Sequence, residues 1–243
     1  MKYLCSAILL LALLVGCSGD KEASKPKKVE PLTEVASSET RWTGVAVAPD
    51  GRIFTCFPRW SPDIPMSVAE VHPDGSLTPY PNEDMNRWTD TLTPQTHFVC
   101  VQALWADAVG HLWVLDPANP QFQGVVEGGP KLVQIHLASN TVVNTFYFDE
   151  TIAPKGSYLN DVRVDNAMGF AYISESGTGS MVVLDIESGE ARRLLVDHPS
   201  TKAEDITLNI DGQPFTNPDG SARKVHCDGI ALAPDGQYVY YQA

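Results

Sequence analysis

A repeat of about sixty residues is the feature that most constrains how this sequence can fold. The segments that start at Thr43 and Asp228 share one pattern: a glycine, an apolar strand, a Pro-Asp-Gly turn and a second strand. Weaker copies start at Val101 and Asn160, so successive starts lie 58, 59 and 68 residues apart. Self-similarity at a nearly constant period indicates a repeat architecture.

Each repeat has the pattern of four short strands joined by tight turns. Turns such as Pro73-Asp74-Gly75 and Glu187-Ser188-Gly189 end in glycine, which accommodates the positive φ of a tight hairpin. No stretch of these repeats has helical apolar spacing over a useful length. In the first three repeats we expect strands at 44–48, 52–57, 67–72 and 76–80, at 101–106, 111–115, 131–137 and 141–148, and at 160–165, 170–175, 180–186 and 190–196.

Four-stranded antiparallel units that repeat at this length are typical of the blades of a β-propeller, so an all-β fold is expected. The expected blades lie near 43–97, 98–155 and 156–225, with an incomplete blade at 226–243. Three and a half blades cannot close a ring, and an open propeller leaves sheet edges exposed. We therefore expect this sequence to be a piece of a longer protein.

The first forty residues predict export and a lipid anchor. Residues 1–16 contain an apolar core at 7–15, which is shorter than the about 20 residues of a membrane span. They end in a glycine before Cys17, which is the pattern of a lipoprotein signal peptide, so Cys17 is expected to carry a diacylglycerol. Residues 17–40 have few apolar side chains and predict a flexible tether. The alternative is an ordinary secretory signal that happens to contain a cysteine.

These features predict a location in the cell envelope, at the outer membrane where the organism has one, or secretion. The membrane is then contacted through the lipid anchor only. The formal net charge of −13 argues against nucleic acid as a partner, because phosphate binding needs clustered lysine and arginine. An acidic domain is compatible with a cationic or neutral small ligand.

The part of the chain at 41–243 is long enough for one domain with a sizeable core. It contains Cys56, Cys100 and Cys227, and three cysteines can form at most one internal disulfide. No pairing among them is assigned. Buried unpaired cysteines in strands are the favoured interpretation.

The third and fourth repeats contain the most distinctive runs of the sequence. These runs lie at 158–165, 171–176, 179–185, 192–195 with His198, and 228–236. They resemble the major royal jelly protein/Yellow family, including its bacterial members, and the resemblance covers most of 41–243. It implies a six-bladed ring. The family includes dopachrome-converting enzymes, amine-binding salivary proteins and storage or signalling proteins, so membership does not define one function.

Asn160-Asp161 and Asp228-Gly229 open the inner strands of the third and fourth repeats. In this they are similar to the more distant gluconolactonase/senescence-marker group, in which such residues ligate a divalent cation at the top of the channel. The similarity implies Asn160 and Asp228 as metal ligands, and Ca²⁺ as the ion, since oxygen donors suit it. Thr43 and Val101 at the equivalent positions cannot complete this site, and the group's acidic ligand on the first blade has no clear match.

The starts of the inner strands converge on the channel mouth in a propeller, so polar residues there are candidates for ligand binding. The candidates are Gln102, Asn160, Asp161 and Asp228, followed by Thr43 and Arg163. In the alternative interpretation, Asn160 and Asp161 only cap their strand by hydrogen-bonding nearby backbone N–H groups.

Histidine and tryptophan are the two remaining residue types considered for a functional role. The six histidines lack the spacing of metal ligands; His226, two residues before Asp228, is kept as a candidate general base. The five tryptophans are expected to pack between blades rather than to form a ligand cage.

The expected function is that of an envelope-tethered propeller of royal-jelly/Yellow type. It would bind, or also convert, a small aromatic or amine-bearing molecule at the channel mouth, and no catalytic residue is assigned. One alternative is a metal-dependent lactone hydrolase in which the ion polarises the lactone carbonyl. Another is a non-catalytic scaffold that uses the propeller face for interactions.

Overall fold

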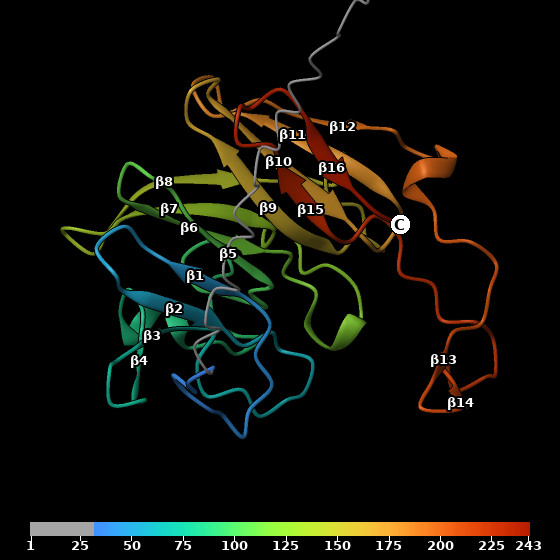
Figure 1. Cartoon of the computed structure of the whole chain (residues 1–243), viewed down its shortest axis with the longest axis horizontal. Coiled ribbons are helices and arrows are strands. Elements are labelled where there is room, and N and C mark those ends of the chain that lie inside the picture. Colours follow the sequence, from blue (N-terminus) through green and yellow to red (C-terminus); the bar gives the residue numbers. More distant parts are fainter. Residues whose placement is uncertain (1–31) are drawn as a thin grey trace, which may run out of the picture. The chain divides into compact units, whose positions relative to one another are not determined.

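The computed structural model describes residues 32–243, and its compact unit runs from Val35 to Ala243 (Figure 1). The predicted signal peptide, the lipidated Cys17 and most of the predicted tether lie outside the described residues. Within 32–243, no helix combines the length and the apolar character that crossing a membrane requires.

The compact unit is built from antiparallel sheets of consecutive strands (Figure 1). The first sheet contains β1 (Val45–Val47), β2 (Ile53–Cys56), β3 (Val68–Val71) and β4 (Leu77–Pro79). The second contains β5 (Ala103–Ala106), β6 (His111–Asp116), β7 (Lys131–His136) and β8 (Thr141–Tyr147). The third contains β9 (Leu159–Asp165), β10 (Phe170–Glu175), β11 (Ser180–Asp185) and β12 (Ala191–Leu194). A further pair is β15 (Ile230–Leu232) with β16 (Val239–Tyr241).

The first strands of these sheets lie next to one another: β5 contacts both β1 and β9, and β9 contacts β15. Sheets that radiate from adjacent inner strands are the blades of a β-propeller, so the predicted all-β propeller fold is confirmed. All twelve strands expected in the first three repeats are present, and their bounds differ from the prediction by at most two residues.

Several short elements were not expected. They are the one-turn helix α1 (Glu83–Asn86), the 3₁₀ turns η1 (Pro120–Phe122) and η2 (Pro199–Thr201), and the small hairpin of β13 (Asn209–Ile210) and β14 (Gln213–Pro214). Elements this short leave no apolar periodicity in a sequence. Helix α1 forms because the Asn82 side chain accepts a hydrogen bond from the Met85 N–H.

The Pro-Asp-Gly turns form as their chemistry dictates. In the first, the Asp50 side chain accepts a hydrogen bond from the Arg52 N–H at 3.1 Å, and Gly51 has a φ of 88°. In the last, Asp235 accepts from the Gln237 N–H at 3.0 Å, and Gly236 has a φ of 71°. Glycine adopts this left-handed conformation at little cost, so the hairpins close where the sequence places them.

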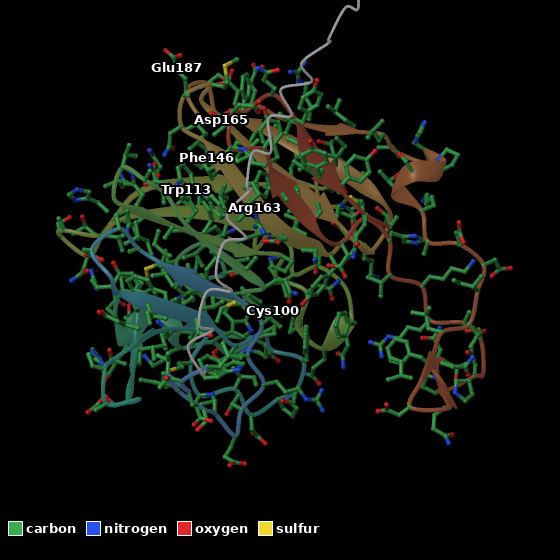
Figure 2. All side chains as sticks on the ribbon, viewed as in Figure 1. Cys100, Trp113, Phe146, Arg163, Asp165 and Glu187 are labelled. Atoms are coloured by element: carbon green, nitrogen blue, oxygen red, sulfur yellow. The ribbon has the colours of Figure 1, made fainter. Side chains whose placement is uncertain are left out.

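The core lies between neighbouring blades. One apolar cluster joins the first two sheets through side chains such as Phe54 and Val114. Another joins the second and third sheets; in it Trp113 is fully buried and stacks on Phe146 at a centroid distance of 6.3 Å (Figure 2). Burial of each large apolar side chain contributes about 1.5–3 kcal/mol, so packing between blades holds the inner strands in place.

Buried carboxylates fix the segments that lead into the inner strands. Asp116, at the end of β6, accepts hydrogen bonds from the N–H groups of Val99 and Cys100 and forms a fully buried ion pair with Lys131 at 2.8 Å. At the same place in the third sheet, the buried carboxylate of Glu175 accepts from the Tyr158 N–H at 2.9 Å. The backbone just before β5 and β9 is thereby held in position.

Cys56, Cys100 and Cys227 are free and buried, as expected from the sequence, but only Cys56 lies in a strand; Cys100 and Cys227 lie in the segments just before β5 and β15. Burial raises the pKa of the Cys56 and Cys227 thiols to about 11 and that of Cys100 to about 12. Thiols of this kind are inert at neutral pH, because the thiolate is the reactive form.

Candidate functional site

The inner strands β1, β5 and β9 line a cavity of about 340 Å³, which we call the channel-mouth cavity. Its lining includes the candidate residues Thr43, Gln102, Asn160, Asp161 and Arg163. Asp228 is not among the lining residues, but it contacts one of them, as described below. The structure therefore brings together side chains that lie up to 120 positions apart in the sequence.

A chain of hydrogen bonds connects the four inner-strand starts. Thr43 Oγ1 donates to the Gln102 carbonyl at 2.9 Å, and Gln102 Nε2 donates to Asn160 Oδ1 at 3.2 Å. Asn160 Nδ2 in turn donates to a carboxylate oxygen of Asp228. Because each amide uses both its nitrogen and its oxygen, the orientations of these side chains are determined before any ligand arrives.

Two aromatic side chains that were not predicted extend this chain. Tyr158 Oη donates to Gln102 Oε1 at 2.8 Å and accepts a hydrogen bond from Trp60 Nε1 at 2.7 Å. Burial raises the pKa of Tyr158, so its hydroxyl stays protonated and acts as a donor. The Phe122 ring packs on both, at centroid distances of 5.9 Å from Trp60 and 5.0 Å from Tyr158.

A charged pair and a tryptophan form another part of the lining. Arg163 Nη1 donates to Asp161 Oδ1 at 2.8 Å, and the guanidinium carbon lies 5.0 Å from the centre of the Trp105 ring. Cation–π contact of this kind holds a guanidinium flat against the ring. The expectation that the tryptophans pack between blades is confirmed for Trp113 and for Trp105, which packs against the same apolar cluster between the second and third sheets and also lines the cavity.

The capping alternative applies to only one of the two residues for which it was considered. Asp161 Oδ1 accepts a hydrogen bond from the Val162 N–H at 2.8 Å, as a capping side chain does. Asn160 uses its oxygen for Gln102 and its nitrogen for Asp228 instead, so it connects blades.

Asp228 is half-buried beside the cavity. Burial raises the pKa of its carboxyl group, the hydrogen bond from Asn160 lowers it in part, and the charge of Asp161 raises it further. Its backbone carbonyl accepts a hydrogen bond from Ser174 Oγ at 2.5 Å, which attaches the fourth repeat to the third.

The residues present do not by themselves make a calcium centre. Asn160 turns its amide nitrogen toward Asp228, whereas a metal ligand would present its oxygen. Within the part of the chain that the structure describes, no three His, Cys, Asp or Glu side chains are grouped so as to hold an ion. Since Ca²⁺ takes about six to eight oxygen ligands, Asn160 and Asp228 alone are too few, and we assign no metal step to this site.

His226 does not line the cavity. Its Nδ1 accepts a hydrogen bond from the Ala203 N–H at 3.0 Å, and its backbone N–H donates to the Ser176 carbonyl at 3.0 Å. Burial lowers the pKa of its imidazole. These contacts assign it to the support of the loop before β15, rather than to the role of general base at the channel mouth.

The fold and the cavity define a β-propeller with a polar site where its inner strands begin. The family model for "Major royal jelly protein" matches residues 99–243. The chain belongs to the major royal jelly protein family, which confirms the resemblance found in its third and fourth repeats. No curated protein sequence matches the chain.

Among solved structures, the chain is similar to a gluconolactonase from Xanthomonas campestris, with 14% identity, a TM-score of 0.47, and coverage of 87% of this chain and 58% of that one. It is similar to a periplasmic gluconolactonase from Pseudomonas aeruginosa, with 19% identity, a TM-score of 0.46, and coverage of 82% and 49%. The extracellular domain of a hybrid two-component system from B. thetaiotaomicron gives 12% identity and a TM-score of 0.47, with coverage of 86% and 20%. The chain spans about half the length of the two gluconolactonases.

Proposed function

We propose that this chain is part of an envelope-tethered propeller that binds a small aromatic or amine-bearing molecule in the channel-mouth cavity. The observation that carries the proposal is the composition of that 340 Å³ space. It presents the carboxylate of Asp161, the amides of Gln102 and Asn160, and the wall formed by Trp105 and Arg163. Small concave sites with a few oriented polar groups are the usual form of a ligand pocket.

Each part of the lining matches a part of such a ligand. An ammonium group would pair with the second carboxylate oxygen of Asp161, since Oδ1 is engaged by Arg163 and the Val162 N–H, and the nearby charge of Asp228 adds to the attraction for a cation. A planar ring would stack on the Trp105–Arg163 wall, since guanidinium and indole both offer flat faces. The amides are already oriented by Tyr158 and Asp228, so little conformational entropy is lost on binding.

The same lining supports binding rather than conversion. Thr43 Oγ1, the hydroxyl of the cavity, donates to a backbone carbonyl instead of to a base. The nearby Cys56 thiol is fully buried, and its pKa is raised to about 11. Among the described lining residues, no nucleophile is paired with a general base, which covalent catalysis would require.

The tether is proposed from Cys17 and the residues around it, which lie outside the described part of the chain. Expression of the full chain in a bacterial host with labelled palmitate tests it. Label is expected on the wild type and not on Cys17→Ser. Equal labelling of both would contradict the anchor, while no labelling of either would favour the ordinary secretory signal.

The ligand is tested by thermal-shift and calorimetric titration of the full chain with tyramine, with catechol and with Ca²⁺. Binding to the folded state increases the free energy of unfolding by mass action, by about 2.7 kcal/mol at a ligand concentration of a hundred times Kd, and Tm rises accordingly. A shift with tyramine that is lost in Asp161→Asn, and kept in the matched surface variant Asp63→Asn, is expected. No shift with tyramine or catechol, or equal shifts in all three proteins, would contradict the proposal.

The two alternatives are distinguished by the same titration. A metal-dependent lactone hydrolase predicts a Ca²⁺ shift that disappears in both Asn160→Ala and Asp228→Ala, two residues in direct contact. An interaction scaffold predicts no shift with any of the small probes.

A further inference from the structure

A second cavity, of about 480 Å³, lies between the loop that follows β2 and the segment that connects β4 to β5. We call it the Arg59 cavity. Its lining includes Arg59, Arg87, Trp88 and His97. Three basic side chains therefore line one cavity of a protein whose formal net charge is −13. None of these residues belongs to the channel-mouth cavity.

Arg59 is the unusual member of this set. It is only 8% exposed; its Nε donates to the Val99 carbonyl and its Nη1 to the Ile64 carbonyl, both at 3.2 Å. Across residues 32–243, no carboxylate forms an ion pair with Arg59, and its Nη2 has no hydrogen-bond partner. Burial lowers the pKa of this guanidinium, and the charge of the Asp116 carboxylate, which does not contact it, offsets that effect only in part.

A buried charge without a counter-charge is unusual, because desolvation is costly unless the charge is paired. The other buried cation of the described chain, Lys131, has its partner in Asp116. Arg59 instead lines a cavity, and its Nη2 has no partner among the described residues. An anion that enters the cavity from outside would supply the missing counter-charge.

The neighbours of Arg59 are arranged to complete such a site. Arg87 is exposed and pairs with Asp84, the one acidic residue found in the lining. His97 uses Nδ1 for contacts with Thr93 and Thr96, and its Nε2 stays available. Because the carboxylate of Asp84 is already engaged by Arg87, it opposes an incoming anion less than a free carboxylate would.

We propose that the Arg59 cavity binds a small organic carboxylate with a planar apolar body. The fork of a guanidinium matches a carboxylate, and charge-assisted hydrogen bonds of this type are among the strongest. The cavity is much larger than a simple inorganic ion needs, and Trp88, Ile64 and Leu92 supply apolar surface for the rest of the ligand. The site is separate from the proposed channel-mouth function and does not depend on it.

Benzoate is the probe, and benzamide is its neutral isostere. Calorimetry on the full chain is expected to show benzoate binding about tenfold or more tightly than benzamide, as one lost charge-assisted contact implies. In ¹⁵N spectra, benzoate should move the indole N–H signal of Trp88, identified through Trp88→Phe. A shift of the Trp105 signal alone would place the ligand in the other cavity and overturn the proposal.

Variants test the cations themselves. Arg59→Lys keeps a charge without the fork, and the double variant R87Q/H97Q leaves the backbone contacts of Arg59 intact. Both are expected to weaken benzoate binding by about tenfold, whereas the surface variant Arg41→Gln leaves it unchanged. If Arg59→Lys does not fold, the double variant still decides. Equal affinity for benzoate and benzamide, or unchanged affinity in R87Q/H97Q, would overturn the proposal.

Discussion

Replacing Tyr158 by phenylalanine removes one oxygen atom from the middle of the hydrogen-bond chain at the channel mouth. The Trp60 N–H and the Gln102 side-chain oxygen then both lose their partner. An unsatisfied buried polar group costs about 1–3 kcal/mol; Trp60 and Gln102 are half-buried, so water replaces part of the loss. We expect a total loss of about 2 kcal/mol for Tyr158→Phe.

The assay is thermal unfolding with the matched variant Tyr238→Phe as control, since Tyr238 is 60% exposed. For a domain of this size about 1 kcal/mol lowers Tm by about 2–4 °C, so Tyr158→Phe should lower Tm by about 4–8 °C. Tyr238→Phe should change stability by less than about 0.5 kcal/mol. Ligand binding at the channel mouth should weaken as well, because the Gln102 amide loses the contact that orients it.

Equal Tm values for Tyr158→Phe and Tyr238→Phe would refute this reasoning. They would mean that water replaces the tyrosine hydroxyl without cost, and that the chain of hydrogen bonds does not preorganise the site. A large loss of stability with unchanged ligand affinity would mean that Tyr158 stabilises the fold without orienting Gln102 for the ligand, and would contradict that second role.

The remaining predictions concern titration, a buried charge and the thiols. Burial raises the pKa of Asp228 in the folded state, so its contribution to stability is present below its unfolded pKa and is lost as pH rises through the folded pKa. The Tm of Asp228→Asn relative to wild type should therefore increase from pH 4 to pH 7; a flat difference would contradict this. Lys131→Met leaves Asp116 as an uncompensated buried charge and should cost about 3–5 kcal/mol in urea unfolding, against about 0–1 kcal/mol for Arg87→Gln in its exposed pair. The three buried cysteines should resist thiol reagents at pH 8 until the protein unfolds, as mass spectrometry of the labelled peptides would show, and rapid labelling of the native protein would refute their burial.

Much of the fold was predictable because it is encoded locally. Apolar alternation and Asp-Gly turns such as Asp50-Gly51 define where strands begin and end, whatever lies elsewhere in the chain. The period of about sixty residues then implies stacked blades, and stacked blades imply that Gln102, Asn160 and Asp228 meet. The structure agrees, with a continuous hydrogen-bond chain through these three side chains.

The residues that reasoning from the sequence missed lie mainly in loops. Trp60 and Arg59 are neighbours in the loop after β2, yet Trp60 joins the channel-mouth chain while Arg59 lines a different cavity. Tyr158 lies two positions before Asn160, so its closeness to an inner-strand start could have indicated that it lies near the channel mouth. No periodic pattern constrains where a loop side chain points, because the loop is positioned by the blades that it packs against.

The sequence alone determined the β-propeller class, the strand bounds and the family, because hairpin turns and strand periodicity act over a few residues and the repeat multiplies their effect. Only the tertiary structure decided which polar groups are satisfied by one another and which are not. Asn160 forms hydrogen bonds with side chains of two other repeats, whereas the buried guanidinium of Arg59 contacts backbone carbonyls and, within residues 32–243, no carboxylate. Such pairing depends on distances between blades, and these are determined by packing across the core rather than by any local run of residues.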